Sequence, residues 1–277
     1  MKKLLTLVLA LVFALSLTAI AEQDTIVIGA TATPHAEVLN LIVDDMAALG
    51  YNIEVRVFTD WQLLPGAVSS KEIAANYFAH VPYLNGYNVT VSEAEYNVPV
   101  IGVHYEPYGI YSDKYESIDQ IPDGATVYLP NDGTNQTRAL FLLKDAGLIN
   151  LPEDVTPEDL LNVLDITADL NPKGLKLNDI EASQLPATLQ DADIAIINGN
   201  YALDAGLSPM VDSIFYEPAE GETAALYTNY VAVLPENVEA DWVKALESCL
   251  CSEKVYEFMT DNEAYAGGVI PFFSLED

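Results

Sequence analysis

The segment L-P-N-D-G-T-N-Q-T-R-A-L, residues 129–140, joins the end of an apolar run to the start of an amphipathic one. Residues 125–129 are predicted to form a short strand. Residues 134–146 carry apolar side chains at helical spacing and are followed by Gly147, a typical helix stop. A strand followed directly by a helix is the building unit of α/β domains. In open α/β sheets ligands bind beyond the carboxyl ends of the strands, which is where residues 130–133 are expected.

Arg138 lies near the beginning of this predicted helix, and the only other arginine in the chain is Arg56. The positive end of a helix dipole favours an anion, so a cation there invites a functional explanation. We predict that the planar fork of Arg138 holds a ligand carboxylate and that Asn135, one turn earlier, offers an amide to the same ligand. The alternative is an arginine paired with one of the 42 acidic residues, and the sequence leaves both interpretations open.

The alternation of strand and helix continues on both sides of this segment. Further strands are predicted at residues 25–30, 52–57, 98–111, 175–180, 192–197 and 226–234, and further helices at 34–49, 183–190 and 241–259. This order implies parallel, helix-covered sheets. The chain is long enough for two α/β lobes, and we expect it to cross between them near residues 104–112 and 222–228.

The first 21 residues have the pattern of a secretory signal peptide. Lysines at the start precede the apolar run Leu4–Thr18, and Ala19-Ile20-Ala21 offers a cleavage site before Glu22. An uncleaved membrane anchor is the alternative. The formal net charge of the chain is −31, which argues against binding to nucleic acid, because such binding rests on neutralising phosphates.

Aromatic residues gather in N-Y-F-A-H-V-P-Y-L, residues 76–84. Phe78, His80 and Tyr83 could line an apolar pocket with a polar edge, suited to a thioether or a short alkyl chain. Ordinary core packing is the alternative for this cluster.

The chain has three histidines, His35, His80 and His104, which could form a zinc site with some of its many carboxylates. None of them has H-x-x-H or H-E-x-x-H spacing, and a metal would leave Arg138 unexplained. The sequence also lacks a G-x-S-x-G elbow, a phosphate-binding loop and a metalloprotease signature. We therefore expect neither an enzyme nor a bound cofactor.

Eight motifs in order make the chain resemble the methionine-binding NlpA/MetQ-type substrate-binding proteins of ABC importers. They are G-A-T-A-T-P-H-A-E (29–37), F-T-D-W (58–61), N-Y-F-A-H-V-P-Y-L (76–84), V-H-Y-E-P-Y-G-I-Y-S (103–112), P-N-D-G-T-N-Q-T-R-A-L (130–140), E-A-S-Q-L-P (181–186), I-N-G-N-Y-A-L-D-A-G-L (197–207) and G-G-V-I-P-F-F (267–273). The resemblance implies an α/β, periplasmic-binding-protein-like (type II) fold whose two lobes close on a free amino acid. Residues 22–105 with 226–277 are expected to form lobe 1, and residues 106–225 lobe 2.

The resemblance also implies the ligand and the residues around it. Arg138 would grip the α-carboxylate of L-methionine or a related apolar amino acid, and asparagines would orient the carboxylate and the ammonium group. The implied site consists of Arg138, Asn135, Asn198 and Asn229 at the polar end, and Trp61, Phe78, His80, Tyr83 and His104 around the side chain. The implied partners are an ABC importer permease and its ATPase, so that the membrane is reached only through the permease.

Two departures from the family pattern modify these expectations. Trp61 stands where the family usually has tyrosine, so a different amino acid or a methionine derivative is an alternative ligand, ahead of a zinc receptor. Lipoprotein members carry a cysteine just after the signal, whereas the cysteines here are Cys249 and Cys251. We therefore expect an exported, extracytoplasmic protein, at the cell surface or in the periplasm, without a lipobox cysteine or the lipid anchor it carries.

Overall fold

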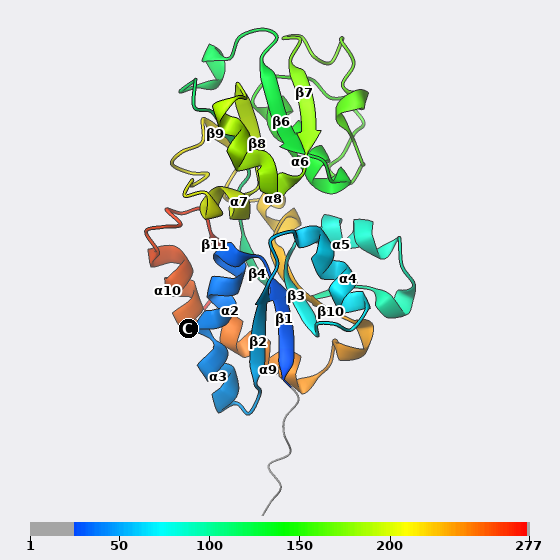
Figure 1. The fold of residues 1–277 in the computed structure, drawn as a ribbon, viewed down its shortest axis with the longest axis vertical. Helices are drawn as coiled ribbons and strands as arrows, with labels where there is room; N and C mark the ends of the chain where they lie inside the picture. Colours follow the sequence, from blue (N-terminus) through cyan, green and yellow to red (C-terminus); the bar gives the residue numbers. More distant parts are fainter. Residues whose placement is uncertain (1–24, 276–277) are drawn as a thin grey trace, which may run out of the picture.

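The computed structural model describes residues 25–275, so the predicted signal peptide, residues 1–21, lies outside the described part. Figure 1 shows two lobes stacked along the long axis of the molecule, each containing one β-sheet with helices packed beside it. This is the α/β architecture that the sequence predicts. No helix of the described residues is long and apolar enough to span a membrane.

The first sheet has six strands in the order β11-β4-β10-β3-β1-β2. Its strands are β1 (Ile26–Ala30), β2 (Ile53–Val57), β3 (Ala75–Ala79), β4 (Val98–Tyr105), β10 (Asn229–Val233) and β11 (Ile270–Pro271). Strand β1 runs parallel to both β2 and β3, with Ile28 opposite Val55 and Ala75. Strand β10 runs antiparallel between β3 and β4.

The second sheet has five strands in the order β7-β6-β8-β5-β9. Its strands are β5 (Gly109–Tyr111), β6 (Thr126–Pro130), β7 (Lys176–Ile180), β8 (Ile194–Ile197) and β9 (Phe215–Tyr216). Strand β6 pairs in parallel with β7 and β8, whereas β5 is antiparallel to its neighbours β8 and β9.

The prediction of purely parallel sheets is wrong, and the reason lies where the chain changes lobe. The single extended segment predicted at 98–111 is two strands, β4 and β5, which belong to different sheets. Pro107 lies between them and has no N–H to offer to a strand ladder. The chain returns to the first sheet between β9 and β10. Strands at these crossings enter their sheets in the reverse direction, which produces the antiparallel pairs.

Two of the predicted helices are each divided into shorter ones. The α-helices of residues 25–275 are α2 (Glu37–Leu41), α3 (Val43–Ala48), α4 (Leu64–Ser69), α5 (Val81–Asn88), α6 (Gly133–Asp145), α7 (Gly199–Asp204), α8 (Glu222–Leu226), α9 (Asp241–Leu250) and α10 (Glu253–Asp261). The predicted helix 34–49 breaks at Ile42, and the predicted helix 241–259 breaks at Cys251. The predicted helix 183–190 is a 3-10 helix, η6 (Ala182–Gln190), with Pro186 inside it.

Apolar side chains form three large clusters that hold these elements together. One cluster lies between the first sheet and the helices packed on it, and another lies within the lobe that contains the second sheet. The remaining cluster contains residues attached to both sheets, among them Leu64 and Phe78 from the first and Leu185 and Ile197 from the second. This shared apolar cluster lies beside the pocket described below, so the lobes are packed against each other there.

Candidate ligand-binding site

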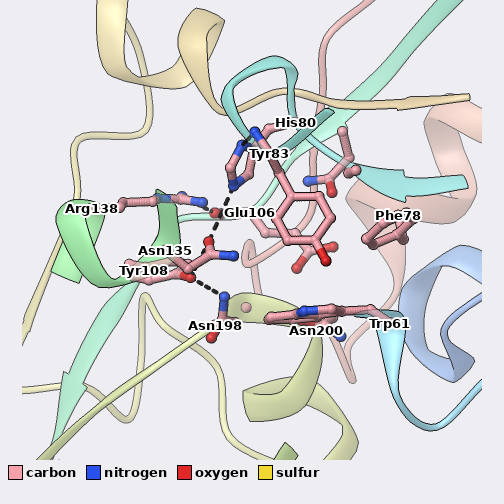
Figure 2. Close-up of a pocket in the computed structure, with 13 residues that line it drawn as sticks. Trp61, Phe78, His80, Tyr83, Glu106, Tyr108, Asn135, Arg138, Asn198 and Asn200 are labelled. Atoms are coloured by element: carbon pink, nitrogen blue, oxygen red, sulfur yellow. Dashed lines mark hydrogen bonds between the residues drawn. The ribbon is translucent and has the colours of Figure 1, made fainter. Parts of the chain in front are cut away.

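A pocket lies between the two lobes. His80 directly follows β3, Asn198 directly follows β8, and Asn135 lies in the first turn of α6, which follows β6. Their side chains meet because the carboxyl ends of these strands face the cleft. Figure 2 shows Arg138, Asn135 and Tyr108 on one side of the pocket and Trp61 and Phe78 on the other.

Eight of the nine predicted site residues line this pocket. They are Trp61, Phe78, His80, Tyr83, Asn135, Arg138, Asn198 and Asn229. His104 does not line it, because it is fully buried behind Glu106, with its Nε2 2.7 Å from a Glu106 carboxylate oxygen. The lining also contains Ala79, Glu106, Tyr108, Gly199 and Asn200, which the sequence did not single out as site residues.

Arg138 is 97% buried, and two of its nitrogens are bound to protein groups. Nε and Nη2 donate to the two carboxylate oxygens of Glu217 at 2.9 and 2.6 Å, and Nη2 also donates to the carbonyl oxygen of Glu106 at 2.8 Å. Nη1 makes no hydrogen bond within residues 25–275, although the residue lines the pocket. The guanidinium group therefore has one edge engaged by Glu217 and one nitrogen left for a ligand.

Aromatic rings fix the plane of this guanidinium group. Its central carbon lies 3.8 Å from the ring centre of Tyr108 and 4.1 Å from that of Tyr227. Such contacts between a cation and a ring face are stabilising, and more so when water is excluded. Both interpretations of Arg138 left open by the sequence are thus compatible, because the arginine is paired with an acid and also reaches the pocket.

Asn135 joins the two lobes through its side chain. The Nδ1 atom of His80 accepts the backbone N–H of Tyr83 at 3.2 Å, so Nε2 carries the proton and donates to Asn135 Oδ1 at 3.1 Å. The Tyr108 hydroxyl donates to the same oxygen at 2.5 Å. The Asn135 amide nitrogen donates to Asp132, which caps helix α6. Asn135 is therefore a structural tie, with its amide held in one orientation.

Glu106 places a buried carboxylate in the pocket wall. One oxygen lies 2.7 Å from His104 Nε2 and 3.5 Å from His35 Nε2. The side chain packs so closely on Gly199 that a Cβ atom there would lie 2.5 Å from the Glu106 Cβ, so only glycine fits. Burial raises the pKa of Glu106 to about 7, against the lowering effects of His35 and Arg138. A cationic group entering the pocket would stabilise the ionised carboxylate.

Two further polar atoms in the wall are buried without a hydrogen-bond partner in the described structure. They are the side-chain oxygen of Asn198 and the side-chain nitrogen of Asn200. Leaving such groups unpaired costs about 1–3 kcal/mol each, which a ligand can recover by bonding to them. The Asn198 oxygen suits an ammonium donor, and the Asn200 nitrogen suits a carboxylate acceptor.

The opposite end of the pocket is apolar. Phe78 and Tyr83 pack edge to face, with ring centres 5.4 Å apart, and Trp61 lies below them in Figure 2, away from Arg138. Trp61 and Phe78 are both buried. A ligand with charged groups at one end and an apolar chain at the other matches this division.

The three histidines lie at two places. His35, His104 and Glu106 each offer a ligand atom, and these atoms lie within 4.8 Å of one another, whereas His80 is not part of this group. His80 is bound to Asn135, whereas His35 and His104 face Glu106. The two other ring nitrogens of this pair are hydrogen-bonded to the hydroxyls of Thr31 and Tyr77. His104 Nε2–H donates to Glu106, and His35 Nε2–H donates to the side-chain oxygen of Asn229 at 3.3 Å. With each Nδ1 accepting a hydroxyl, both rings are satisfied as hydrogen-bonding groups.

This fold is shared with known proteins. A family model described as NlpA lipoprotein matches residues 26–273. The chain belongs to the NlpA lipoprotein family. The resemblance inferred from the eight motifs is confirmed by this match.

Relatives of this NlpA-family chain include proteins named for methionine. The methionine-binding lipoprotein MetQ of Bacillus subtilis (strain 168) is 36% identical over 282 residues, covering 98% of this chain and 99% of that protein. The D-methionine-binding lipoprotein MetQ of Escherichia coli (strain K12) is 37% identical over 243 residues, covering 85% and 82%. The structure of a nutrient-binding protein from Burkholderia cenocepacia bound to methionine superposes with a TM-score of 0.82 at 35% identity, covering 90% and 100%. The predicted binding-protein fold is thereby confirmed.

The localisation expected from the sequence is contradicted by these relatives. Both the family description and the names of the relatives are those of lipoproteins, which carry a cysteine at the cleavage site. The expectation of an unanchored protein rested on residues near position 22, which lie outside the described residues. The inference that lipid anchoring is excluded is therefore withdrawn.

The buried histidines of this NlpA-family protein predict how its stability depends on pH. Burial lowers the pKa of His35 to about 4 and the pKa values of His80 and His104 to about 3. In the unfolded chain all three histidines bind protons below about pH 6.5, whereas in the folded protein they stay neutral until about pH 4 or below. The free energy of unfolding therefore falls as the pH drops from 6.5 towards 4. Glu106 acts in the opposite direction, because its raised pKa lets the folded protein bind the proton first.

Between pH 6 and pH 5 these four groups give a net uptake of about two protons on unfolding. We expect the free energy of unfolding to fall by about 2.5 kcal/mol over this pH unit. Urea unfolding curves recorded at pH 7, 6 and 5 would measure it. A free energy of unfolding that stays constant from pH 6.5 to 5 would contradict the assignment of three neutral buried histidines.

Proposed function

We propose that this protein captures a free apolar amino acid, L-methionine or a close analogue, between its lobes and delivers it to the permease of an ABC importer. The main support for the proposal is that two residues of opposite charge line the same pocket. Arg138 and Glu106 lie at the polar end, and an aromatic wall faces them. The names of the relatives support methionine as the ligand and binding, rather than catalysis, as the activity.

In the proposed complex the ligand's α-carboxylate accepts from Arg138 Nη1 and from the unpaired amide of Asn200. The α-ammonium group faces Glu106 and donates to the unpaired oxygen of Asn198. Charge-assisted hydrogen bonds of this kind are about twice as strong as neutral ones, and the buried pocket strengthens them further. The thioether chain then extends towards Trp61 and Phe78, where sulfur–aromatic contacts are favourable.

We also propose that two lobes move relative to each other when the ligand binds. Residues 22–105 with 226–277 are proposed as lobe 1 and residues 106–225 as lobe 2, joined at the crossings between β4 and β5 and between β9 and β10. The two-sheet topology supports this division. Closure of such lobes about a hinge is how related folds enclose small ligands.

The proposed function is tested with methionine and with ligands that each change one part of the methionine molecule. Differential scanning fluorimetry should show stabilisation by methionine and norleucine, and none by N-acetylmethionine or methionine methyl ester. The derivatives each remove one of the two charges that the polar end requires. Stabilisation by both derivatives would contradict recognition of a zwitterion. Stabilisation only by another amino acid would keep the charge frame and move attention to Trp61.

Removing an aromatic wall should affect a long side chain more than a short one. We expect Phe78→Ala to raise the Kd for methionine at least about tenfold and the Kd for alanine less than about threefold, because the lost contact is made only by the longer chain. Titration calorimetry with both ligands measures this. Phe258→Ala is the matched control, since Phe258 packs edge to face on Tyr265 and does not line the pocket. Equal effects of Phe78→Ala on the two ligands would place the side chain elsewhere.

A further inference from the structure

Trp61 and Tyr201 form a stacked pair from opposite sides of the cleft. Trp61 begins the short helical turn η2 (Trp61–Leu63), which follows β2 of the first sheet. Tyr201 lies on α7, which follows β8 of the second sheet. The ring centres are 4.8 Å apart, with 27° between the planes. The contact therefore ties together segments that belong to different sheets.

A hydrogen bond reinforces this stack. The Tyr201 hydroxyl donates to the carbonyl oxygen of Thr59 at 3.0 Å, again between the two sheets' connections. Trp61 is 6% exposed and Tyr201 is 7% exposed, so the stacked rings are shielded from water, and the hydrogen bond is partly buried. Figure 2 shows Trp61 on the opposite side of the pocket from Arg138. The contact between Trp61 and Tyr201 therefore lies on the other side of the pocket from Arg138, which is bound to Glu217.

We propose that Tyr201 is a latch that holds the cleft closed on the Trp61 side and fixes the indole ring as the pocket wall. Tyr201 is a positioning residue in this account, because it does not itself line the pocket. The inference rests on the proposed function for the identity of the ligand. It adds a residue that controls how long the ligand remains bound.

The latch acts on release more than on capture. Ligand-free protein exchanges between a form with the lobes apart, which the ligand enters, and a form with the lobes tied by the stack and the hydrogen bond. Over a bound ligand both contacts must break before the ligand can leave. Loss of the hydroxyl should therefore raise the dissociation rate constant and leave the association rate constant nearly unchanged. One neutral hydrogen bond corresponds to roughly a 3- to 10-fold effect.

The test compares two tyrosine-to-phenylalanine variants by stopped-flow fluorescence with L-methionine as the probe. Tyr201→Phe removes a hydroxyl that bridges the cleft. Tyr111→Phe is the matched control, because its hydroxyl is buried and has no partner among residues 25–275. A Trp242→Phe background leaves Trp61 as the single tryptophan reporter, since the chain has two tryptophans.

We expect Tyr201→Phe to dissociate methionine about 3- to 10-fold faster, with an association rate constant within about twofold of wild type. Tyr111→Phe should leave both rate constants unchanged. Tyr201→Leu, which also removes the stack, should dissociate faster still. An unchanged dissociation rate in Tyr201→Phe, or an equal increase in Tyr111→Phe, would overturn the latch.

A second readout does not depend on the ligand. Small-angle X-ray scattering of ligand-free protein should give a larger radius of gyration for Tyr201→Leu than for wild type and Tyr111→Phe, because the lobes are no longer tied. Equal radii would overturn the proposal even if wild type bound no methionine. That last result would separately contradict the proposed function.

Discussion

Replacing Arg138 with methionine is expected to weaken methionine binding by about 3 kcal/mol, roughly a 100-fold rise in Kd. The same change should lower the free energy of unfolding by about 3–5 kcal/mol, because it leaves the buried carboxylate of Glu217 without its partner. Titration calorimetry and urea unfolding measure the two effects separately. Arg56→Met is the control, because this other arginine makes exposed ion pairs that contribute little.

A double variant separates the two roles of the arginine. Arg138→Met with Glu217→Leu removes both buried charges, and such replacements are often neutral or stabilising. We expect the double variant to regain most of the lost stability and none of the lost affinity. Recovery of affinity together with stability would mean that Arg138 serves only as the partner of Glu217.

Replacing Glu106 with glutamine should remove the acceptor for the ligand's ammonium group. We expect a rise in Kd of at least about 30-fold at pH 8, where wild-type Glu106 is ionised. Wild-type affinity should also fall as the pH drops below about 7, the pKa to which burial raises Glu106. The sign follows because the bound ammonium requires the ionised carboxylate, so a proton must leave before binding.

The glutamine variant should lose this pH dependence, since it has no proton to release. Calorimetry at pH 8, 7, 6 and 5 tests both parts, and Glu247→Gln, an exposed acid on α9, is the control. Unchanged affinity in Glu106→Gln at pH 8 would show that the ammonium group is held elsewhere. A parallel decline of affinity with falling pH in both proteins would assign the pH dependence to another group.

Much of the polar end of the site was predictable from local pattern. The strand–loop–helix segment at 129–140 places Asn135 and Arg138 just beyond the carboxyl end of strand β6. This local placement does not depend on which lobe contains the strand. The aromatic segment at 76–84 could be either a pocket wall or core packing from the sequence, and its first residues form strand β3. Residues of both segments line the pocket, and local pattern could group them because they are neighbours in sequence.

The acids of the site were not predictable in the same way. Glu217 is 79 residues from Arg138 in the sequence, so only the fold brings the pair together. Glu106 had a usable signal, because it lies two residues after His104 in an extended segment, where alternate side chains share a face. In a chain with 42 acidic residues that signal is hidden, since most acids face solvent.

The strand and helix breaks were missed for a related reason. Hydrophobic periodicity runs through Ile42 and Cys251 without interruption, and the breaks there depend on how α2, α3, α9 and α10 pack on the first sheet. The change of lobe between β4 and β5 is likewise invisible to periodicity, since both strands are extended and apolar. Tertiary packing decides these boundaries.

The decisive measurement is calorimetric titration of L-methionine into residues 22–277, after unfolding and refolding to remove any bound ligand. We expect one site per chain with a micromolar or lower Kd, which corresponds to a binding free energy of about −8 kcal/mol or better. Absence of binding by methionine and by every other apolar amino acid, in protein that unfolds cooperatively, would contradict the proposed function.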